Sequence, residues 1–342
     1  MTNDTGHLKR ILLPQPIESE AVALLEKEGF KIVLSPDPKP ETVRPLMTDT
    51  HALILRTGIK ITEELLGTAH ELRIISRTGG GLDNVDIDAA SQRGIIVTSN
   101  VGVNTSSVVE HVLSLMLALS KQLLVLDRAV RNDNFKIRYK NLPRDLRGKT
   151  LGLVGFGRIG SRLGHICHKT FQMRIMAFDP LLQKEFKGRY TDWMKFTSIR
   201  ELFSSSDVIS VHVPLTDNTF HAVGEEEISW MKPEALLINT SRGPVIDQPA
   251  LIRALSEKRI GGAGLDVFSQ EPVPKDDPLL NLENVILTPH SAALTKECVI
   301  RMAVEAAKCV VDLSRGREPR NVANRQVLSA DRWKHLVPRA NE

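Results

Sequence analysis

Three side chains able to carry out acid–base chemistry each follow a predicted strand in the second half of the chain. They are Arg242 after a strand at 235–239, Glu271 after a strand at 262–267, and His290 after a strand at 285–288. An arginine fork can bind a carboxylate and polarise the adjacent carbonyl or hydroxyl group. A histidine beside a carboxylate can take up and return a proton near neutral pH. The pattern therefore indicates proton transfer beside an anion site.

A glycine-rich turn precedes these residues. Gly155, Gly157 and Gly160 form the pattern G-x-G-x-x-G between a short apolar run and a predicted helix. The first glycine permits a tight turn, the second lets a pyrophosphate approach the backbone, and the third allows close packing of helix on strand. Phosphates bind the unpaired N–H groups at such a helix start, here those near Arg158 and Ile159. This predicts a dinucleotide site.

An acidic residue closes the strand after that helix. Asp179 lies 19 residues beyond Gly160, where a carboxylate accepts hydrogen bonds from a ribose diol. A carboxylate in this position repels a 2′-phosphate, and no arginine follows in 180–183. We therefore predict NAD as the cofactor, preferred over NADP.

The elements that must position these residues alternate between strand-like and helix-like patterns, which predicts parallel sheets with crossover helices. In the first part we predict strands at 10–13, 31–34, 52–55, 73–76 and 95–98, and helices at 18–28, 62–69 and 87–93. In the second part we predict strands at 151–156, 174–178 and 207–213, the three strands named above, and a helix at 158–171.

We therefore expect an α/β protein with two doubly wound parallel-sheet domains, a flavodoxin-like substrate domain and a Rossmann NAD-binding domain. Ligands of such sheets bind beyond the carboxyl ends of the strands, so the active site is expected in the cleft between the domains. A helical pattern at 295–313 should return to the first domain. The expected bounds are 1–103 with 297–328 for the substrate-binding domain, 104–296 for the NAD-binding domain, and 329–342 for a weakly patterned tail.

Composition restricts the class of protein. The chain has 342 residues, a net charge of +4 and 42% hydrophobic residues, which is typical of a soluble protein of two domains. Basic residues cluster only in 131–147, which we interpret as a solvated loop, and no nucleic-acid motif accompanies them. The N-terminus has no apolar core, so it does not resemble a signal peptide.

The three cysteines, Cys167, Cys298 and Cys309, lack metal-ligand spacing and are expected to be reduced thiols. We therefore expect a cytoplasmic protein with no metal, no nucleic-acid partner and no membrane. The most apolar stretch, 108–126, is interrupted by charged and polar residues, and we predict a long buried or interface helix rather than a membrane span. A helix this apolar cannot face water along its length, so we expect a homodimer that uses it.

Several short motifs occur in a fixed order between Gly148 and Thr295. They are Met231-Lys232-Pro233, the run 239–243, the run 264–268, and Thr288-Pro289-His290. In these motifs the chain resembles the D-isomer-specific 2-hydroxyacid dehydrogenases, which include D-3-phosphoglycerate, D-lactate, glycerate/hydroxypyruvate and phosphite dehydrogenases. The resemblance covers nearly the whole length. It implies an NAD-dependent oxidoreductase that transfers a hydride between nicotinamide and C2 of a small D-2-hydroxy acid or 2-keto acid.

The resemblance also implies site residues. Arg242, Glu271 and His290 match the catalytic positions: His290 as general acid and base, Glu271 as its partner, and Arg242 as the group that binds the carboxylate and carbonyl. Further positions are expected at the cofactor: His212, Val213, Pro214, Thr240, Ser241 and Asp266. Of these, we interpret His212 as a packing residue with backbone contacts nearby, whereas His111 on the apolar helix is expected to be structural.

Substrate contacts are implied in the first domain. Gly80 and Gly81 lie in a glycine loop whose backbone amides would hold the substrate carboxylate. Arg56, followed by Thr57, matches a position that carries an arginine to the substrate phosphate in phosphoglycerate enzymes, although relatives with other substrates share it. The sequence departs from the family's pattern at two places. The loop 100–104 lacks the proline that is frequent in the family, and Gly80 occupies a position where phosphoglycerate enzymes often have threonine.

The candidate substrates are therefore 3-phosphoglycerate, glycerate/hydroxypyruvate or a related small acid, and no added regulatory domain is expected. Formate oxidation is disfavoured because formate dehydrogenases pair the histidine with glutamine, and phosphite oxidation needs a lysine where Gly80 stands. A nicotinamide-sensing binding or corepressor-like protein on the same fold is the alternative. Turnover of a 2-keto acid separates the two interpretations.

Overall fold

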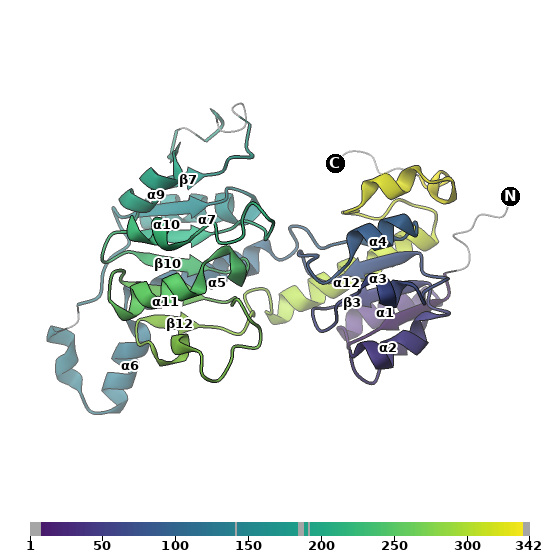
Figure 1. Ribbon diagram of the computed structural model, residues 1–342, viewed down its shortest axis with the longest axis horizontal. Helices are drawn as coiled ribbons and strands as arrows, with labels where there is room; N and C mark the ends of the chain where they lie inside the picture. Colours follow the sequence, from purple (N-terminus) through teal and green to yellow (C-terminus); the bar gives the residue numbers. More distant parts are fainter. Residues whose placement is uncertain (1–7, 141, 184–187, 191, 338–342) are drawn as a thin grey trace. The chain divides into compact units, whose positions relative to one another are not determined.

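The computed structural model describes residues 8–140, 142–183, 188–190 and 192–337. The chain divides into two compact units, each built on its own parallel sheet (Figure 1). Unit 1 consists of Met1–Asn104 and Leu294–Glu342, and unit 2 consists of Thr105–Ala293. The predicted fold class, two doubly wound parallel sheets, is confirmed.

The sheet of unit 1 has the order β2-β1-β3-β4-β5, and all its strand pairs are parallel. This is the flavodoxin-like order. The inner strands are almost entirely apolar because helices cover both faces. The strands are β1 (Arg10–Leu13), β2 (Lys31–Leu34), β3 (Ala52–Leu55), β4 (Ile74–Arg77) and β5 (Ile96–Thr98).

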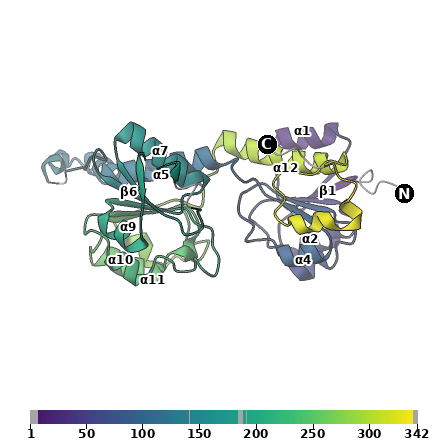
Figure 2. The same ribbon diagram turned by 90° about the horizontal axis from the view of Figure 1, so that it is seen from above.

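Successive residues of each strand point to opposite faces of the sheet. Ile11 and Ile54 pack in the core that includes α1 and α12, whereas Leu12 and Leu53 pack in the core on the other face. Figure 2 shows α1 and α12 on one side of this sheet and α2 and α4 on the other. The helices are α1 (Ser19–Lys27), α2 (Pro40–Met47), α3 (Glu63–Leu66), α4 (Ile87–Gln92) and α12 (Lys296–Ser314).

The segment that was expected to be a weakly patterned tail is packed on unit 1 as far as residue 337. It follows the 3-10 helix η5 (Arg325–Ser329) and contains the 3-10 helix η6 (Asp331–Trp333). Trp333 is buried in the unit 1 core, and its indole N–H donates a hydrogen bond of 2.9 Å to the Gly94 carbonyl. Burial of this large aromatic side chain explains why a segment without clear periodicity is held to the domain.

The sheet of unit 2 has the order β12-β11-β10-β9-β6-β7-β8, again entirely parallel. The strand order reverses between β6 and β9, which creates the switch point where doubly wound sheets bind dinucleotides. The strands are β6 (Thr150–Val154), β7 (Arg174–Phe178), β8 (Met194–Phe196), β9 (Val208–Val211), β10 (Leu236–Asn239), β11 (Gly262–Leu265) and β12 (Val285–Leu287).

Two layers of helices cover this sheet. Figure 2 shows α5 and α7 on one face, and α9, α10 and α11 on the other. The α-helices are α5 (Thr105–Ser120), α6 (Leu123–Arg131), α7 (Arg158–Phe171), α9 (Ile199–Ser205), α10 (Glu225–Ser229) and α11 (Gln248–Ser256), and the 3-10 helices are η2 (Phe135–Tyr139), η3 (Gly243–Val245) and η4 (Pro278–Asn281).

The prediction of one long helix over 108–126 is wrong. Helix α5 ends at Ser120, Gln122 adopts a left-handed conformation with φ of 52°, and α6 starts at Leu123. The two helix axes differ by 57°. A left-handed residue cannot continue a right-handed helix, so the polar pair Lys121-Gln122 ends it.

The break changes where the apolar surface lies. The apolar face of α5, including Val112, Leu115 and Met116, is buried within unit 2. The exposed apolar side chains belong instead to α6 and the segment after it, which extend away from the sheet (Figure 1). Among the described residues no single helix is long and apolar enough to span a membrane; α5 and α6 meet that criterion only as a bent pair.

Candidate active site

A glycine loop joins β6 to α7 at the switch point. Gly155 has a φ of 93°, and a Cβ atom there would lie 2.8 Å from the His212 carbonyl oxygen. A Cβ atom on Gly160 would collide with the Gly155 carbonyl oxygen. Both close approaches require glycine, so the motif predicted from the sequence performs the packing expected of it.

The start of α7 has the properties of a phosphate site. The helix begins after Gly157 without a capping side chain, and a Cβ atom on Gly157 would meet nothing within 4 Å. The first N–H groups of a helix, here those of Arg158 and Ile159, lack intrahelical partners and attract anions. The loop therefore offers both donors and room for a pyrophosphate.

Asp179 lies directly after β7 and is held by the same loop. Its Oδ2 accepts a hydrogen bond of 2.9 Å from the Phe156 N–H, and its Oδ1 accepts one of 3.0 Å from the Leu181 N–H. A carboxylate can accept about four hydrogen bonds, so lone pairs remain for a ribose diol. The carboxylate is therefore fixed beside the glycine loop.

In the loops beyond the carboxyl ends of β9 and β10, two buried polar atoms have no hydrogen-bond partner among the described residues: His212 Nε2, after β9, and Thr240 Oγ1, after β10. Burial lowers the pKa of His212 to about 4, so the ring is neutral. Unpaired buried polar atoms call for a partner, and a polar ligand would supply one. Val213 and Pro214 follow His212 in the same loop. Together with the open glycine loop, these atoms fit the predicted dinucleotide.

The loop that carries Arg242 is folded by a residue that the sequence analysis did not assign. Asn239 Oδ1 accepts hydrogen bonds from the Ser241 N–H at 3.0 Å and hydroxyl at 2.8 Å, and its Nδ2 donates to the Arg242 carbonyl at 2.9 Å. Arg242 is half-buried, and its Nη1 donates to the Ser241 carbonyl at 2.7 Å. An asparagine at a strand end is the signal for such a turn.

Glu271 and His290 form a hydrogen-bonded pair. His290 Nδ1 lies 2.7 Å from Glu271 Oε2, and Glu271 Oε1 accepts a bond of 3.1 Å from the Phe268 N–H. A carboxylate can only accept, so Nδ1 carries the proton and Nε2 is left to exchange one. Both side chains are partly open to solvent, with 39% and 37% of their surface exposed. The pair therefore has the geometry of a general acid–base.

Opposing effects act on the pKa of Glu271. Partial burial tends to raise it, but the hydrogen bonds from His290 and the Phe268 N–H, together with the charges of His290 and Arg242, lower it more. The pKa of Glu271 therefore lies below its ordinary range, and the carboxylate stays ionised beside the imidazole. Arg242 thus belongs to the same electrostatic environment as the pair.

His290 adopts a left-handed backbone conformation, with φ of 50°. This conformation costs a residue with a Cβ atom about 1–2 kcal/mol. Asp266, fully buried, holds it in place: its carbonyl accepts from the His290 N–H at 2.8 Å. Its carboxylate accepts from Thr288 Oγ1 at 2.6 Å and from the N–H groups of Ser291 and Ala292, each at 2.9 Å. Asp266 therefore organises the loop of His290, while its expected contact with the cofactor stays a prediction.

The candidate substrate residues lie in unit 1, after β3 and β4. Arg56 Nη1 lies 3.2 Å from Glu18 Oε1 and donates to the Pro16 carbonyl at 3.3 Å. Thr57 and Gly80 are exposed, and Gly81 is partly so. Arg56 therefore already has a carboxylate partner within its own unit.

Asn84 is a further organising residue that the sequence analysis missed. Its Nδ2 donates to the carbonyls of Arg56 at 3.0 Å and Ile59 at 2.9 Å, and its Oδ1 accepts from Arg77 Nε at 2.8 Å. The side chain thus ties the loop after β3 to the loop after β4. Its place three residues after the glycines 79–81 was the signal available in the sequence.

The family model of the D-isomer specific 2-hydroxyacid dehydrogenase NAD binding domain matches residues 113–292. The chain belongs to this family. Glyoxylate reductase of Korarchaeum cryptofilum is 38% identical over 325 residues, which are 93% of this chain and 97% of that protein. D-3-phosphoglycerate dehydrogenase of Archaeoglobus fulgidus is 34% identical over 329 residues, 96% of this chain but 62% of that protein. Among solved structures, D-lactate dehydrogenase of Aquifex aeolicus with NAD and lactic acid matches with a TM-score of 0.80 and 32% identity, covering 90% of this chain and 96% of that one.

Membership of the 2-hydroxyacid dehydrogenases makes the chain an oxidoreductase and confirms NAD as the predicted cofactor. The match places the NAD-binding domain within unit 2, which contains the glycine loop, Asp179 and the three predicted catalytic residues. Among the described residues no group of three or more His, Cys, Asp or Glu side chains could hold a metal ion.

Proposed function

We propose that this dehydrogenase reduces a small, unphosphorylated 2-keto acid, glyoxylate or hydroxypyruvate, to the D-2-hydroxy acid. The observation that carries the proposal is the 2.7 Å contact between His290 Nδ1 and Glu271 Oε2, which leaves Nε2 of the ring for proton transfer. An electrostatically coupled arginine and a histidine–carboxylate pair are the groups that keto acid reduction requires.

In the proposed reaction each side chain has one task. Arg242 binds the substrate carboxylate with two parallel hydrogen bonds and polarises the neighbouring carbonyl. His290 Nε2 donates a proton to the carbonyl oxygen, and in the reverse direction removes it from the hydroxyl group. Glu271 stabilises the imidazolium and fixes the orientation of the ring. NADH, when bound, supplies the hydride that C2 accepts.

The choice of an unphosphorylated substrate rests on Arg56. A phosphate-binding arginine needs its guanidinium available, whereas Arg56 is 3.2 Å from Glu18 and about one third exposed. A phosphate would have to compete with that carboxylate. Gly80 and Gly81 stay our proposed carboxylate-binding loop in unit 1, and Thr57 a proposed neighbour of the substrate.

The test is NADH oxidation with glyoxylate, hydroxypyruvate, phosphohydroxypyruvate, pyruvate and sulfopyruvate. We expect the highest kcat/KM for glyoxylate or hydroxypyruvate. In a Glu18→Gln variant, kcat/KM for phosphohydroxypyruvate should come closer to that for glyoxylate or hydroxypyruvate, because Arg56 loses its carboxylate partner. Preferential turnover of phosphohydroxypyruvate by the wild type would overturn the substrate assignment. NADH binding without turnover of any acid would favour a nicotinamide-sensing protein.

Cofactor preference should follow Asp179. We expect kcat/KM with NADH to exceed that with NADPH by roughly tenfold or more, because the carboxylate binds a diol and repels a phosphate. Asp179→Ala should narrow this ratio. The variant also loses the acceptor of the Phe156 N–H and could contain less folded enzyme. The quantity to measure is therefore kcat/KM with NADH divided by kcat/KM with NADPH, because a loss of folded enzyme lowers both values equally. Equal use of both cofactors by the wild type would contradict the assignment.

The pH profile should depend on Glu271. Its pKa is lowered in the folded protein, so the ion pair stabilises the fold above the ordinary glutamate range and that contribution is lost as the pH falls through the lowered value. In Glu271→Gln the imidazolium loses its stabilising carboxylate. The pH above which reduction fails should therefore move down, while oxidation of the hydroxy acid persists to lower pH. Profiles of kcat in both directions test this, and an unchanged profile would rule Glu271 out as the partner.

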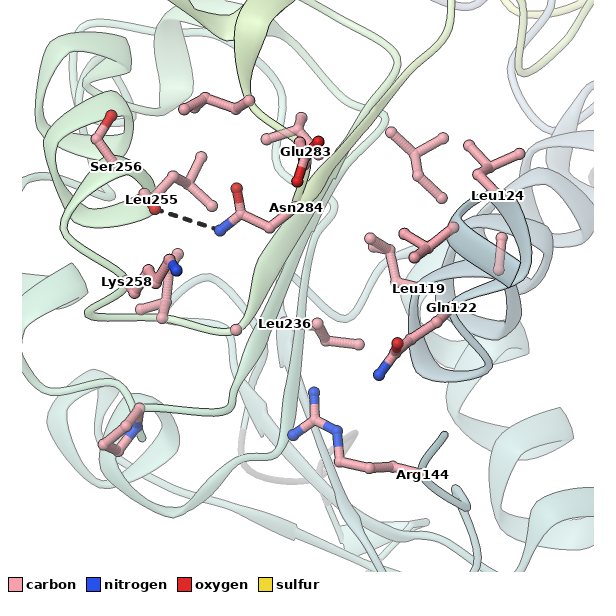
Figure 3. Close-up of a pocket in the computed structure, with 18 of the residues that line it drawn as sticks. Leu119, Gln122, Leu124, Arg144, Leu236, Leu255, Ser256, Lys258, Glu283 and Asn284 are labelled. Atoms are coloured by element: carbon pink, nitrogen blue, oxygen red, sulfur yellow. Dashed lines mark hydrogen bonds between the residues drawn. The ribbon is translucent and has the colours of Figure 1, made fainter. Parts of the chain in front are cut away.

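We also propose a homodimer, and the break at Gln122 moves the proposed contact from α5 to α6. Exposed apolar side chains follow one another along α6 and the segment after it: Leu123, Leu124, Val130, Phe135 and Tyr139. Beside them a groove of about 520 Å³ runs along the amino ends of β10 to β12 (Figure 3). Figure 3 shows Leu119, Leu124 and Leu236 toward one side of it and Lys258 and Asn284 toward the other. A second copy of the chain would cover this apolar surface.

A charge on α6 should separate the dimer. Leu124 is 55% exposed and Leu34, on the edge strand of unit 1, is 52% exposed. Leu124→Glu should give a monomer by light scattering at micromolar concentration, because a buried unpaired carboxylate opposes association. The matched Leu34→Glu should leave the dimer intact. A monomeric wild type would contradict the proposal.

We place the protein in the cytoplasm because its cysteines suit a reducing compartment. Cys167, Cys298 and Cys309 are free and buried. Burial raises the pKa of Cys167 to about 12 and that of Cys309 to about 11, so these thiols are unreactive.

A further inference from the structure

His111 on α5 contacts the residues that hold the His290 loop. Its Nε2 lies 2.9 Å from Thr288 Oγ1 and 3.6 Å from Asp266 Oδ1. Asp266 has 1% of its side chain exposed, whereas His111 has 21% exposed. The sequence predicted a structural histidine on an apolar helix, but this one reaches the carboxylate that organises the candidate active site.

The hydrogen bonds of this contact have only one possible direction. The Thr288 hydroxyl donates its single proton to Asp266 Oδ1 at 2.6 Å. It must therefore accept the bond from His111, so Nε2 of His111 carries a proton. A chain of two hydrogen bonds thus runs from α5 through Thr288 to Asp266.

These two hydrogen bonds lead to the residue that holds the loop of the proposed proton donor. Asp266 binds His290 through its carbonyl and binds Ser291 and Ala292 through its carboxylate, so it holds the loop on both sides of the left-handed His290. A hydroxyl group without the His111 donor could rotate to other acceptors. The Oδ1 atom would then lose one of its two hydrogen bonds and keep only the one from the Ser291 N–H.

We propose that His111 is a positioning residue for catalysis: through Thr288 and Asp266 it fixes the loop that presents Nε2 of His290 to the keto acid. The proposal rests on the role of His290 given above. A histidine that only stabilised α5 would affect the unfolding temperature and leave turnover by the folded enzyme unchanged. The positioning role requires a loss of kcat that a restored donor repairs.

The first experiment compares His111→Leu with His111→Gln in NADH-dependent reduction of glyoxylate or hydroxypyruvate. The amide of glutamine can place a donor near the position of Nε2, whereas leucine cannot. We expect kcat about tenfold lower in His111→Leu, the scale of one lost hydrogen bond. KM for the keto acid and Kd for NADH should change less than about threefold, and His111→Gln should recover most of kcat. Ser114→Ala, one turn along α5 and exposed, should behave as wild type.

A double-mutant cycle then tests the path. Thr288→Val removes the hydroxyl, whereas Thr288→Ser keeps it and should retain kcat. If His111 acts through Thr288, the double variant His111→Leu/Thr288→Val should lose no more kcat than the worse single variant. If the loss of kcat in the double variant equals the product of the two single losses, the proposed path is overturned. An unchanged kcat in His111→Leu would overturn the positioning role.

The variant His290→Ala separates this inference from the proposed function. If His290→Ala keeps wild-type turnover, the proposed proton donor is wrong and the inference falls with it. If His290→Ala is inactive while His111→Leu is fully active, only the inference fails. In the His290→Ala background, His111→Leu should cause no further loss, and a further loss would show that His111 acts elsewhere.

Discussion

Replacing His290 with alanine is expected to lower kcat on the order of 10²–10⁴-fold in both directions of the reaction. The ring is the only group of the proposed triad that can both give and take a proton near neutral pH. Without it, the developing alkoxide must take its proton from water. Kd for NADH should stay nearly unchanged, because the glycine loop and Asp179 lie on different strands from His290.

The chain contains a matched control for this variant. His221 is also a histidine with φ of 50°; it is exposed, and its ring stacks on Phe220 with centroids 4.0 Å apart. In both variants alanine replaces a histidine whose backbone is in the left-handed region, so any effect of the substitution on the backbone is expected in both. Steady-state NADH oxidation should show a large loss only for His290→Ala. Near-normal rates in that variant would remove the triad as the catalytic centre.

Arg242→Lys is expected to lower kcat/KM for the keto acid on the order of 10²-fold, mainly through KM. Lysine retains the charge, but a point charge cannot form two parallel hydrogen bonds to a carboxylate. It also loses the guanidinium contact to the Ser241 carbonyl, which is 2.7 Å long and orients the fork. Initial rates over a range of keto acid concentrations separate the two parameters.

Arg253→Lys is the control for this second substitution. Arg253 lies on α11, is exposed, and pairs with Glu225 at 2.7 Å. A surface ion pair of this kind contributes little because water and salt screen it, so its replacement should leave kcat/KM unchanged. An Arg242→Lys enzyme with wild-type KM would mean that another cation binds the substrate carboxylate.

Most sheet strands were predictable because they are short apolar runs, whereas the three-residue strand β8 (Met194–Phe196), with an exposed lysine at its centre, was not predicted. The runs at 10–13, 31–34 and 52–55 coincide with β1, β2 and β3. Helix α2 was not predicted, since Pro45 within it is typical of a turn. The break at Gln122 was also missed, because an apolar pattern says nothing about a single left-handed residue between two helices.

The candidate site was predictable wherever a motif combines residue type with position. The glycine loop, Asp179, and the pairing of Glu271 with His290 are of this kind. The contacts of several supporting residues were not predictable, because they join residues that are distant in sequence. Asp266 and Ala292 are 26 positions apart, and His111 and Thr288 are 177 apart. Such contacts exist only after the strands are assembled.

The double use of Asp179 limits how this protein can be redesigned. A change to NADPH would begin by removing the carboxylate that repels a 2′-phosphate. The same carboxylate accepts the Phe156 N–H bond at 2.9 Å, so removal leaves a donor of the pyrophosphate loop without its acceptor. An engineered enzyme therefore needs an uncharged acceptor at this position, such as a serine hydroxyl, before arginines are introduced at 180–183.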